Sequence, residues 1–428
     1  MSNDVRANSA APAARGSARN RDVPLLFATR AARLFAYGLV SVVLVLHLTA
    51  AGLSEVRIGL LLTLALLGDT GISLLLTTRA DRLGRRRTLV LGAALMVVAA
   101  AAFAATTSFP LLLLAATVGV LSPSGNEVGP FLAVEQAALS QELPAERRTA
   151  VFAWYGLTGS LATAAGALFG GVLAEALQRA GLAPLASYRG VMLGYGLLGL
   201  ILAALFQRMS PGVEAPPVGA GVSGAMFGLH RSRRVVLELS ALFSVDAFAG
   251  GFVVQSFVAW WFHARFGTGP ALLGAIFFGA NVLAGISALS AAAIARRIGL
   301  VNTMVATHLP SNVLLALVPL MPTLPLAIAV LLIRFSISQM DVPTRQSYTM
   351  AVVDPDERSA AAGVTGIART IGASLAPLAA GPLYASAALA SVPFFVAGGL
   401  KIAYDLALWR RFRAVRPREE RGASARDV

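Results

Sequence analysis

The chain has 428 residues, of which 57% are hydrophobic and 13% charged, and it carries a formal net charge of +14. A soluble domain has about 45–50% apolar and about 25% charged residues, so this composition excludes a soluble globular protein and predicts an integral membrane protein. The sequence contains no cysteine, which excludes disulfides and thiolate metal sites. Its arginines are scattered between apolar runs, so membrane topology explains the positive charge better than nucleic-acid binding does.

The two ends of the chain are polar. Residues 1–22 are rich in alanine, asparagine, serine and arginine and lack the apolar core of a secretory signal peptide. This composition predicts a disordered cytoplasmic tail, and residues 412–428 are expected to form a similar charged tail.

A succession of apolar runs fills the sequence between the tails. A hydrocarbon core about 30 Å thick needs about 20 helical residues, and the runs and their breaks predict an all-α membrane protein with twelve transmembrane helices. The predicted helices are 25–51, 57–78, 88–109, 110–140, 148–177, 189–209, 235–264, 270–295, 301–321, 323–351, 359–386 and 389–411.

Arginines divide the connections between these helices into two classes. They gather in the even-numbered connections and after the last helix, as in the five arginines of residues 79–87, whereas the odd-numbered connections hold only a few. Arginine and lysine are enriched in cytoplasmic loops. The pattern therefore predicts a multi-pass protein of the inner (plasma) membrane with both termini in the cytoplasm.

A polar break at residues 210–234 lies near the middle of the chain and contains three prolines and several glycines. It predicts a cytoplasmic linker between two six-helix bundles, which would occupy residues 23–209 and 235–411.

The two halves resemble each other in sequence. Residues 144–147 (Pro-Ala-Glu-Arg) match residues 355–358 (Pro-Asp-Glu-Arg), and residues 80–84 match residues 295–299 at nearly the same offset. Duplicated halves are common in secondary transporters, which bind their solutes near the midplane between the halves.

The connection between the second and third predicted helices carries the segment Asp81-Arg82-Leu83-Gly84-Arg85-Arg86. This segment resembles the Gly-x-x-x-Asp-Arg-x-Gly-Arg-Arg signature loop of the major facilitator superfamily, with Thr77 in place of the first glycine. The resemblance implies a fold of two pseudo-symmetric six-helix bundles and transport by alternating access. It also implies that the loop acts in gating, with Asp81 latched against a helix end of the other half, where the helix dipole favours a carboxylate. The alternative is that the loop only sets the orientation of the chain.

A glycine-rich segment lies in the fifth predicted helix. Residues 166–171 (Gly-Ala-Leu-Phe-Gly-Gly) resemble the Gly-Pro-x-x-Gly-Gly segment of antiporters in this superfamily, except that Ala167 replaces the proline. Small residues also let membrane helices approach closely, so helix packing explains the segment equally well.

Charged residues lie deep within several predicted helices. A charge at the bilayer centre costs about 2.5–3.5 kcal/mol on insertion scales, so each such residue needs a physical reason. The deep residues are Asp69, Glu127, Asp246, Arg334, Asp341 and Arg369, and Glu135 and Arg345 occupy shallower positions.

Four carboxylates are candidates for proton coupling. Glu127 and Asp246 are the first choices because neither has a partner of opposite charge nearby in the sequence, and a carboxyl group in a membrane cavity can bind and release a proton. Asp69 and Asp341 are further candidates. Asp341 and Arg345 are spaced i,i+4, however, and can instead neutralise each other.

The resemblance further implies that the first, fourth, seventh and tenth helices line a central cavity. Candidates for contacts with the solute on these helices are Arg334, Arg345, Glu135 and Tyr37. Arg334 stays charged at all accessible pH values, so it can hold an anionic solute or a carboxylate. Residues 122–130 place two prolines and two glycines around Glu127, which predicts a broken helix that exposes its backbone to the cavity; a kink that serves packing alone is the alternative.

These patterns predict a secondary transporter that moves a small organic solute by alternating access. Proton-coupled export is the first choice. Proton-coupled uptake and a transport-inactive membrane sensor or scaffold are the alternatives. Lys401 is the only lysine and no Gly-x-x-x-x-Gly-Lys-Ser/Thr loop occurs, which disfavours ATP-driven transport by this chain.

An enzymatic role is not expected, because the chain has no cysteine, no histidine cluster and no Gly-x-Ser-x-Gly elbow. The expected partners are a small-molecule solute, a proton or other coupling ion, and the lipid bilayer. No nucleic acid, cofactor or metal is expected, and the chain is expected to act as a monomer.

Overall fold

The structure, a computed structural model, describes residues 11–142, 145–214, 231–354 and 357–413. Within these ranges only the backbone is described for residues 11–21, 78, 81–82, 140–142, 145–150, 153 and 359.

All regular secondary structure in the described part of the chain is helical, with no strand. The α-helices are α1 (Ala11–Ala50), α2 (Glu55–Leu83), α3 (Arg85–Ala105), α4 (Phe109–Val118), α5 (Phe131–Glu142), α6 (Ala145–Arg179), α7 (Pro184–Gln207), α8 (Arg233–Gly251), α9 (Gln255–Phe266), α10 (Pro270–Ile298), α11 (Leu300–Leu317), α12 (Leu324–Ile337), α13 (Asp341–Val352), α14 (Arg358–Tyr384) and α15 (Val392–Phe412). Two short 3₁₀ helices, η1 (Pro211–Val213) and η2 (Val318–Leu320), follow α7 and α11.

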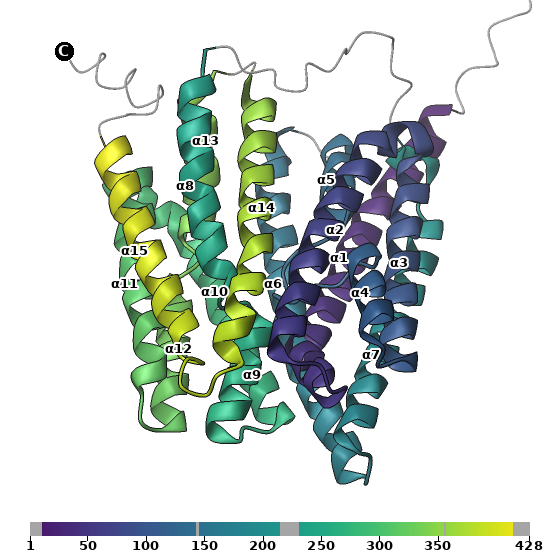
Figure 1. Cartoon of the computed structure of the whole chain (residues 1–428). Coiled ribbons are helices and arrows are strands. Elements are labelled where there is room, and N and C mark those ends of the chain that lie inside the picture. The colour runs from purple at the N-terminus through teal and green to yellow at the C-terminus, as the bar shows by residue number, and fades with distance from the viewer. Residues whose placement is uncertain (1–10, 143–144, 215–230, 355–356, 414–428) are drawn as a thin grey trace, which may run out of the picture.

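The described helices contain ten apolar spans long enough to cross a membrane, together with the shorter apolar helix α4. Two of the ten spans each join a pair of helices, α8 with α9 and α12 with α13. The pair α4 and α5 forms a further crossing, and α14 forms another (Figure 1). The structure therefore has the predicted all-α fold with twelve crossings.

The first helix begins earlier than predicted. α1 starts at Ala11, so it includes residues 11–22, which the sequence analysis assigns to a disordered tail. Alanine and arginine are good helix formers, which favours this extension. Asp22 fixes the helix to the end of the first half, because its carboxylate accepts hydrogen bonds from the backbone N–H of Ser210 at 3.0 Å and from the Ser210 hydroxyl.

The fourth, seventh and tenth crossings are each interrupted along their length. Residues 119–130 separate α4 from α5, and shorter breaks at 252–254 and 338–340 separate α8 from α9 and α12 from α13. Within the first break, Gly125 and Gly129 have φ angles of +71° and +81°, a left-handed backbone that other residues rarely adopt. The break predicted around Glu127 is therefore present, and we call residues 119–130 the α4–α5 break.

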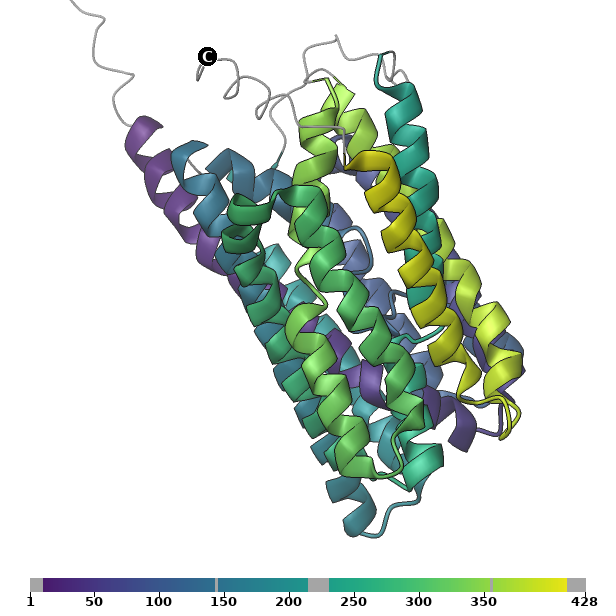
Figure 2. The same ribbon diagram turned by 90° about the vertical axis from the view of Figure 1, so that its left-hand side faces the viewer.

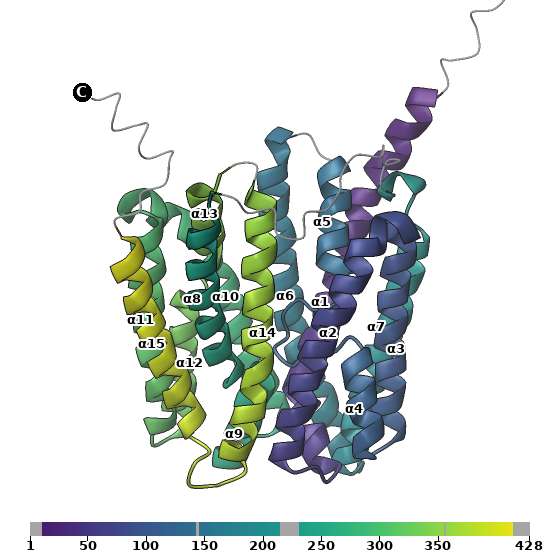
Figure 3. The same ribbon diagram turned by 45° about the horizontal axis from the view of Figure 1, so that its top comes forward.

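The two halves of the chain lie side by side (Figures 1 and 3). The helices α1–α7 form one group and α8–α15 the other, and α6 packs against α10 while α2 packs against α14. Glycines permit both close approaches. A Cβ atom on Gly171 would lie 2.1 Å from the carbonyl oxygen of Pro270, and one on Gly59 would lie 2.4 Å from that of Pro377.

α1 begins and α15 ends at the same end of the bundle (Figure 2). We call this end the terminus side and the opposite end the far side. Hydrogen bonds that join the two halves cluster toward the far side. The Ser256 hydroxyl, at the start of α9, lies 2.6 Å from the carbonyl oxygen of Ser41 and 2.7 Å from that of Pro123, and Gln255 Nε2 donates to Ser41 Oγ at 2.7 Å. The structure is thus held together at the far side.

Candidate functional site

The first half contains a buried cluster of two arginines and two glutamates, which we call the N-cluster (Arg30, Arg33, Glu127, Glu135). Arg33 Nη1 and Nη2 donate to the two carboxylate oxygens of Glu135 at 2.6 and 2.8 Å, and Arg33 Nε donates to Glu127 at 2.8 Å. Arg30 Nη1 donates to the other Glu127 oxygen at 2.9 Å. The side chains of Arg33 and Glu135 are 0% exposed, so this ion pair is fully buried, whereas the side chains of Arg30 and Glu127 are 11% and 17% exposed.

Neighbouring hydroxyl groups complete the hydrogen bonding of Glu135. Thr29 Oγ1 donates to it at 3.0 Å, and the Tyr155 hydroxyl also donates to it. Arg30 in turn donates from Nε to the carbonyl oxygen of Tyr155 at 2.7 Å and lies over the Tyr155 ring. Buried ion pairs are tolerated when the remaining polar atoms are satisfied in this way.

The N-cluster corrects the expectation that Glu127 is an unpaired carboxylate. Its partners Arg30 and Arg33 are 97 and 94 residues away in the sequence, so a search for local partners does not find them. Tyr37, a predicted solute contact, is fully buried and donates its hydroxyl to the carbonyl oxygen of Val128 at 3.0 Å. Tyr37 therefore supports the α4–α5 break.

Asp69 is a buried carboxylate in the middle of a membrane-spanning helix of the first half, and it lacks an ion pair in the described part of the chain. Asp22 also lacks one there, but it lies near the start of α1 and is bound by Ser210. Asp69 lies on the buried face of α2 that also carries Leu62 and Ala65, and its residue is 8% exposed. The backbone N–H of Gly129 donates to Asp69 Oδ1 at 2.7 Å. Asp69 thus contacts the same break that carries Glu127.

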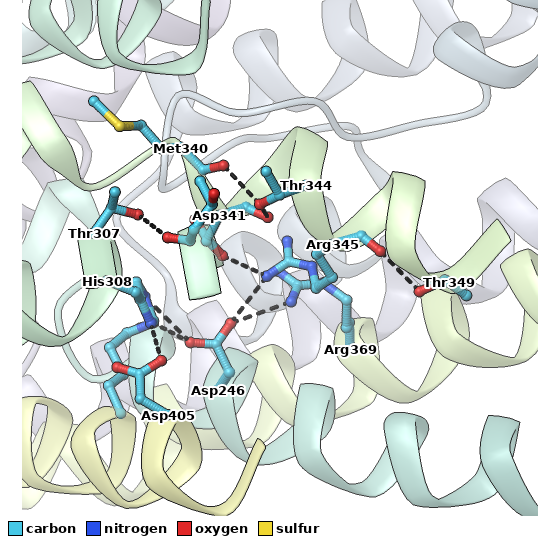
Figure 4. Close-up of polar contacts among 12 residues, drawn as sticks. Asp246, Thr307, His308, Met340, Asp341, Thr344, Arg345, Thr349, Arg369 and Asp405 are labelled. Atoms are coloured by element: carbon cyan, nitrogen blue, oxygen red, sulfur yellow. Dashed lines mark hydrogen bonds and ion pairs between the residues drawn. The ribbon is translucent and has the colours of Figure 1, made fainter. Parts of the chain in front are cut away.

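The second half contains a larger charged cluster around Asp246, which lies on α8. Lys401 Nζ lies 2.6 Å from Asp246 Oδ1, while Arg369 Nη1 and Arg345 Nη1 lie 3.2 and 3.5 Å from Asp246 Oδ2. Figure 4 shows both arginine side chains directed at this carboxylate. Like Glu127, Asp246 was expected to be unpaired and is instead surrounded by cations from α13, α14 and α15.

Histidine 308 connects Asp246 to a second buried carboxylate. His308 Nδ1 lies 2.8 Å from Asp405 Oδ1, and His308 Nε2 lies 3.7 Å from Asp246 Oδ1 (Figure 4). Asn312 Nδ2 donates to Asp405 Oδ2 at 3.0 Å. Asp405, Lys401 and His308 are members of this site that were not predicted from the sequence. The i,i+4 spacing of Lys401 and Asp405 in the middle of an apolar helix was the available signal.

The remaining predicted residues of the second half lie around the same carboxylates. Arg345 Nη1 donates to Asp341 Oδ2 at 2.8 Å, so the i,i+4 pair suggested as an alternative is present. Arg334, on α12, interacts electrostatically with Asp341 and Asp246, and its Nε is buried without a hydrogen-bond partner in the described part of the chain. We call the set Asp246, His308, Arg334, Asp341, Arg345, Arg369, Lys401 and Asp405 the C-cluster.

The signature loop has a defined contact within its own half. Gly84, with a φ of +96°, joins α2 to α3, and the backbone N–H groups of Arg85 and Arg86 donate to the carboxylate of Glu214 at 2.6 and 3.2 Å. A carboxylate is favoured at a helix N-terminus, and Glu214 occupies that position for α3. The side chains of Asp81 and Arg82 lie outside the described part of the structure, so the predicted latch stays a prediction.

The described residues contain no group of three or more histidine, cysteine, aspartate and glutamate side chains able to hold a metal ion. The arrangement instead offers a carboxylate without an ion pair next to a helix break, and a cation-rich cluster in the opposite half. Proton binding and anion binding are the chemical properties that such groups provide.

Comparisons with known proteins agree with this fold. The sequence profile described as Major Facilitator Superfamily matches residues 26–377. The uncharacterised membrane protein YJR124C of Saccharomyces cerevisiae is 31% identical over 426 residues, an alignment that covers 92% of this chain and 95% of the yeast protein.

Solved structures with the same fold include three transporters. A bacterial homologue of the human lysosomal transporter Spinster, inward-facing and occupied, has a TM-score of 0.68 at 16% identity, covering 91% of this chain and 94% of the other. The nucleoside transporter NupG has a TM-score of 0.67 at 13% identity, covering 91% and 98%. A D-xylose–proton symporter has a TM-score of 0.67 at 14% identity, covering 91% and 97%.

The family profile covers most of the chain, and the neighbouring folds belong to transporters and not to enzymes. The twelve crossings, the signature loop and this match agree, and the chain belongs to the Major Facilitator Superfamily of membrane transporters.

Proposed function

We propose that this protein is a proton-coupled secondary transporter of a small organic solute and that Asp69 carries the coupling proton. The observation that carries the proposal is the burial of Asp69 without an ion pair in the described part of the chain, in contact with the α4–α5 break. A carboxylate with a cationic partner is held in its charged form, whereas one without such a partner can exchange a proton more readily. We therefore propose Asp69, in place of Glu127 and Asp246, as the proton carrier.

The α4–α5 break offers a route from proton binding to a conformational change. Gly129 of the break donates to Asp69, Glu127 of the break is held by the arginines of α1, and Pro123 of the break accepts a hydrogen bond from Ser256 in the other half. Protonation removes the negative charge that holds Gly129 and thereby weakens a contact of the break. In this proposal the break transmits that change to the far-side contact between the halves.

Export by antiport is the direction proposed first, with proton-coupled uptake as the alternative. The antiporter-like glycine segment supplies little further support for export, because its glycines serve packing. Cβ atoms on Gly166 and Gly170 would lie 2.0 and 2.3 Å from carbonyl oxygens of α1, at Phe35 and Leu39. The direction is therefore left to the transport assay below.

The test is a proteoliposome assay with an imposed pH gradient and an internal pH-sensitive dye. Solutes for the panel follow from the neighbouring folds, which include a nucleoside transporter, a D-xylose–proton symporter and an organic anion transporter. The relevant solute is one whose transport by the wild-type chain is accompanied by proton movement. The Asp69→Asn variant should still let this solute exchange down its own gradient, but without proton movement. The direction of solute movement relative to the proton gradient distinguishes export from uptake.

A matched control is Glu55→Gln, which removes a carboxylate from the first turn of the same helix and should leave coupling unchanged. Proton movement in Asp69→Asn equal to that of the wild type would refute the assignment. A chain that moves none of the solutes in either direction would favour the transport-inactive sensor or scaffold.

A further inference from the structure

The charged clusters of the two halves differ in their balance of charge. The N-cluster contains two arginines and two glutamates and is electrically neutral. The C-cluster contains three carboxylates, at Asp246, Asp341 and Asp405, and four groups that are ordinarily cationic, at Arg334, Arg345, Arg369 and Lys401, with His308 as a fifth basic group. The C-cluster therefore has at least one positive charge more than its carboxylates can neutralise.

Two arginines of the C-cluster have unused hydrogen-bond donors. Arg369 makes one side-chain hydrogen bond in the described part of the chain, from Nη1 to Asp246, and its side chain is 32% exposed. Arg334 Nε is buried and has no hydrogen-bond partner in the same part of the chain. A guanidinium group has five N–H donors in a fixed plane, so both residues can bind another acceptor.

The exposed part of Arg369 does not face the lipid. The outer face of α14 is marked by exposed residues at Ile367, Ile371 and Leu378, and at 100° per residue Arg369 lies on the opposite side of the helix. Arg334 likewise shares a face of α12 with the buried residues Ala327 and Leu331. Both arginines point into the second half, and both lie within electrostatic range of Asp246 and Asp341.

An uncompensated positive charge within the membrane is unfavourable, and a bound anion removes the imbalance. Arginine is also the residue best suited to bind a planar carboxylate or a phosphate through two parallel hydrogen bonds. We infer that the C-cluster is the binding site for an anionic group, a carboxylate or a phosphate monoester, of the transported solute, with Arg369 as the direct contact and Arg334 as the second. This inference names the substrate class of the proposed transporter and rests on that function.

The position of the site favours a soluble anion over a lipid headgroup. Arg369 lies eleven residues beyond Arg358, the first residue of α14, which corresponds to a depth of about 16 Å along the helix. Lipid phosphates lie at the membrane surface. A headgroup would have to leave that surface to reach the guanidinium.

The experiment measures the thermal stability of the purified full-length chain, in detergent, in phosphatidylcholine vesicles and in phosphatidylglycerol vesicles, as a function of probe concentration. The anionic probes are benzoate, phenyl phosphate and citrate, and benzamide is the neutral analogue of benzoate. A ligand that binds the folded chain raises Tm. At least one anionic probe should raise the Tm of the wild-type chain, whereas benzamide should not.

Three variants connect the binding to the proposed arginines. For the same Tm shift, Arg369→Gln should need a concentration of the active probe at least about tenfold higher than the wild type needs, because the substitution removes a charge-assisted hydrogen bond. Arg369→Lys should lie between the wild type and Arg369→Gln, because lysine keeps the charge but loses the planar fork. Arg334→Gln should also weaken binding. Arg265→Gln removes an exposed arginine at the end of α9 and should bind the probe as the wild type does.

Several results would overturn the inference. These are a wild-type chain that responds to none of the anions, an equal response to benzamide, or unchanged anion binding in both Arg369→Gln and Arg334→Gln. Stabilisation by phosphatidylglycerol vesicles but not by soluble anions would identify a lipid site and would also refute it. Proton-coupled transport of a neutral solute with no anion binding would refute this inference alone and leave the role of Asp69 standing.

Discussion

Arg33 shows how a single residue holds the first half together. Its guanidinium contacts both Glu127 and Glu135, and the side chain is 0% exposed. Removing one partner from a buried ion pair leaves an uncompensated charge, which is far more costly than the loss of a surface pair. The residue therefore acts as the shared counter-ion of two carboxylates from two different segments.

At this scale we predict that Arg33→Leu lowers the free energy of unfolding by about 3–5 kcal/mol. Thermal and denaturant unfolding in detergent would measure the loss. The matched control is Arg179→Leu, because Arg179 pairs with Glu175 at the surface with its side chain 79% exposed, and exposed pairs contribute about 0–1 kcal/mol. Equal stability losses in the two variants would contradict this account of the N-cluster.

At the scale of elements, small residues and the α4–α5 break determine how the halves meet. Gly171 lets α6 approach α10, and Gly59 lets α2 approach α14. The α4–α5 break and the first residues of α9 add the hydrogen bonds at the far side. The far-side closure thus depends on close backbone contacts that a larger side chain would prevent.

We predict that Gly171→Val opens the far side, because its Cβ would lie 2.1 Å from the carbonyl oxygen of Pro270. Overpacking costs about 1–3 kcal/mol, and about 1.4 kcal/mol of that range already corresponds to a tenfold population shift. The chain contains no cysteine, so Ser41→Cys supplies a single thiol at the far-side contact. Its rate of labelling by a membrane-impermeant maleimide should rise about tenfold in the valine variant.

The control for this experiment is Gly194→Val, because nothing lies within 4 Å of a Cβ atom built on Gly194. Ser256→Ala, which removes a far-side hydrogen bond, should change the labelling rate in the same direction by a smaller amount. Unchanged labelling in both Gly171→Val and Ser256→Ala would argue against far-side closure by these contacts.

Two features of the whole molecule have functional consequences. The charged clusters of the two halves differ in net charge, and α1 begins on the side where α15 ends (Figure 2). One half combines a neutral cluster with Asp69, and the other has an excess of cations. A protonated Asp69 together with a bound anion would leave both halves without uncompensated charge. α1 begins and α15 ends on the same side (Figure 2), which agrees with an even number of crossings.

We predict that the terminus side faces the cytoplasm, because arginine-rich connections are favoured there. Single cysteines at Ala387, between α14 and α15, and at Gly212, in η1, mark the far side and the terminus side. In intact cells an impermeant maleimide should label Ala387→Cys, whereas Gly212→Cys should be labelled only after lysis. The reverse pattern would show the opposite orientation.

The sequence alone determined the membrane class, the helix count and the family, because long apolar runs, arginine-rich connections and the loop at Asp81–Arg86 are local features of the chain. It also located the α4–α5 break, since prolines and glycines act on their own backbone, and the Asp341–Arg345 pair, since i,i+4 residues share a helix face.

Only the tertiary structure decided which charges are paired. Glu127 and Asp246 have partners between 62 and 155 residues away, on other helices, and no local pattern encodes such distances. The same packing left Asp69 without an ion pair in the described part of the chain and gathered an excess of cations in the C-cluster. The physical reason is that the side chains around a buried charge come from whichever helices pack against it.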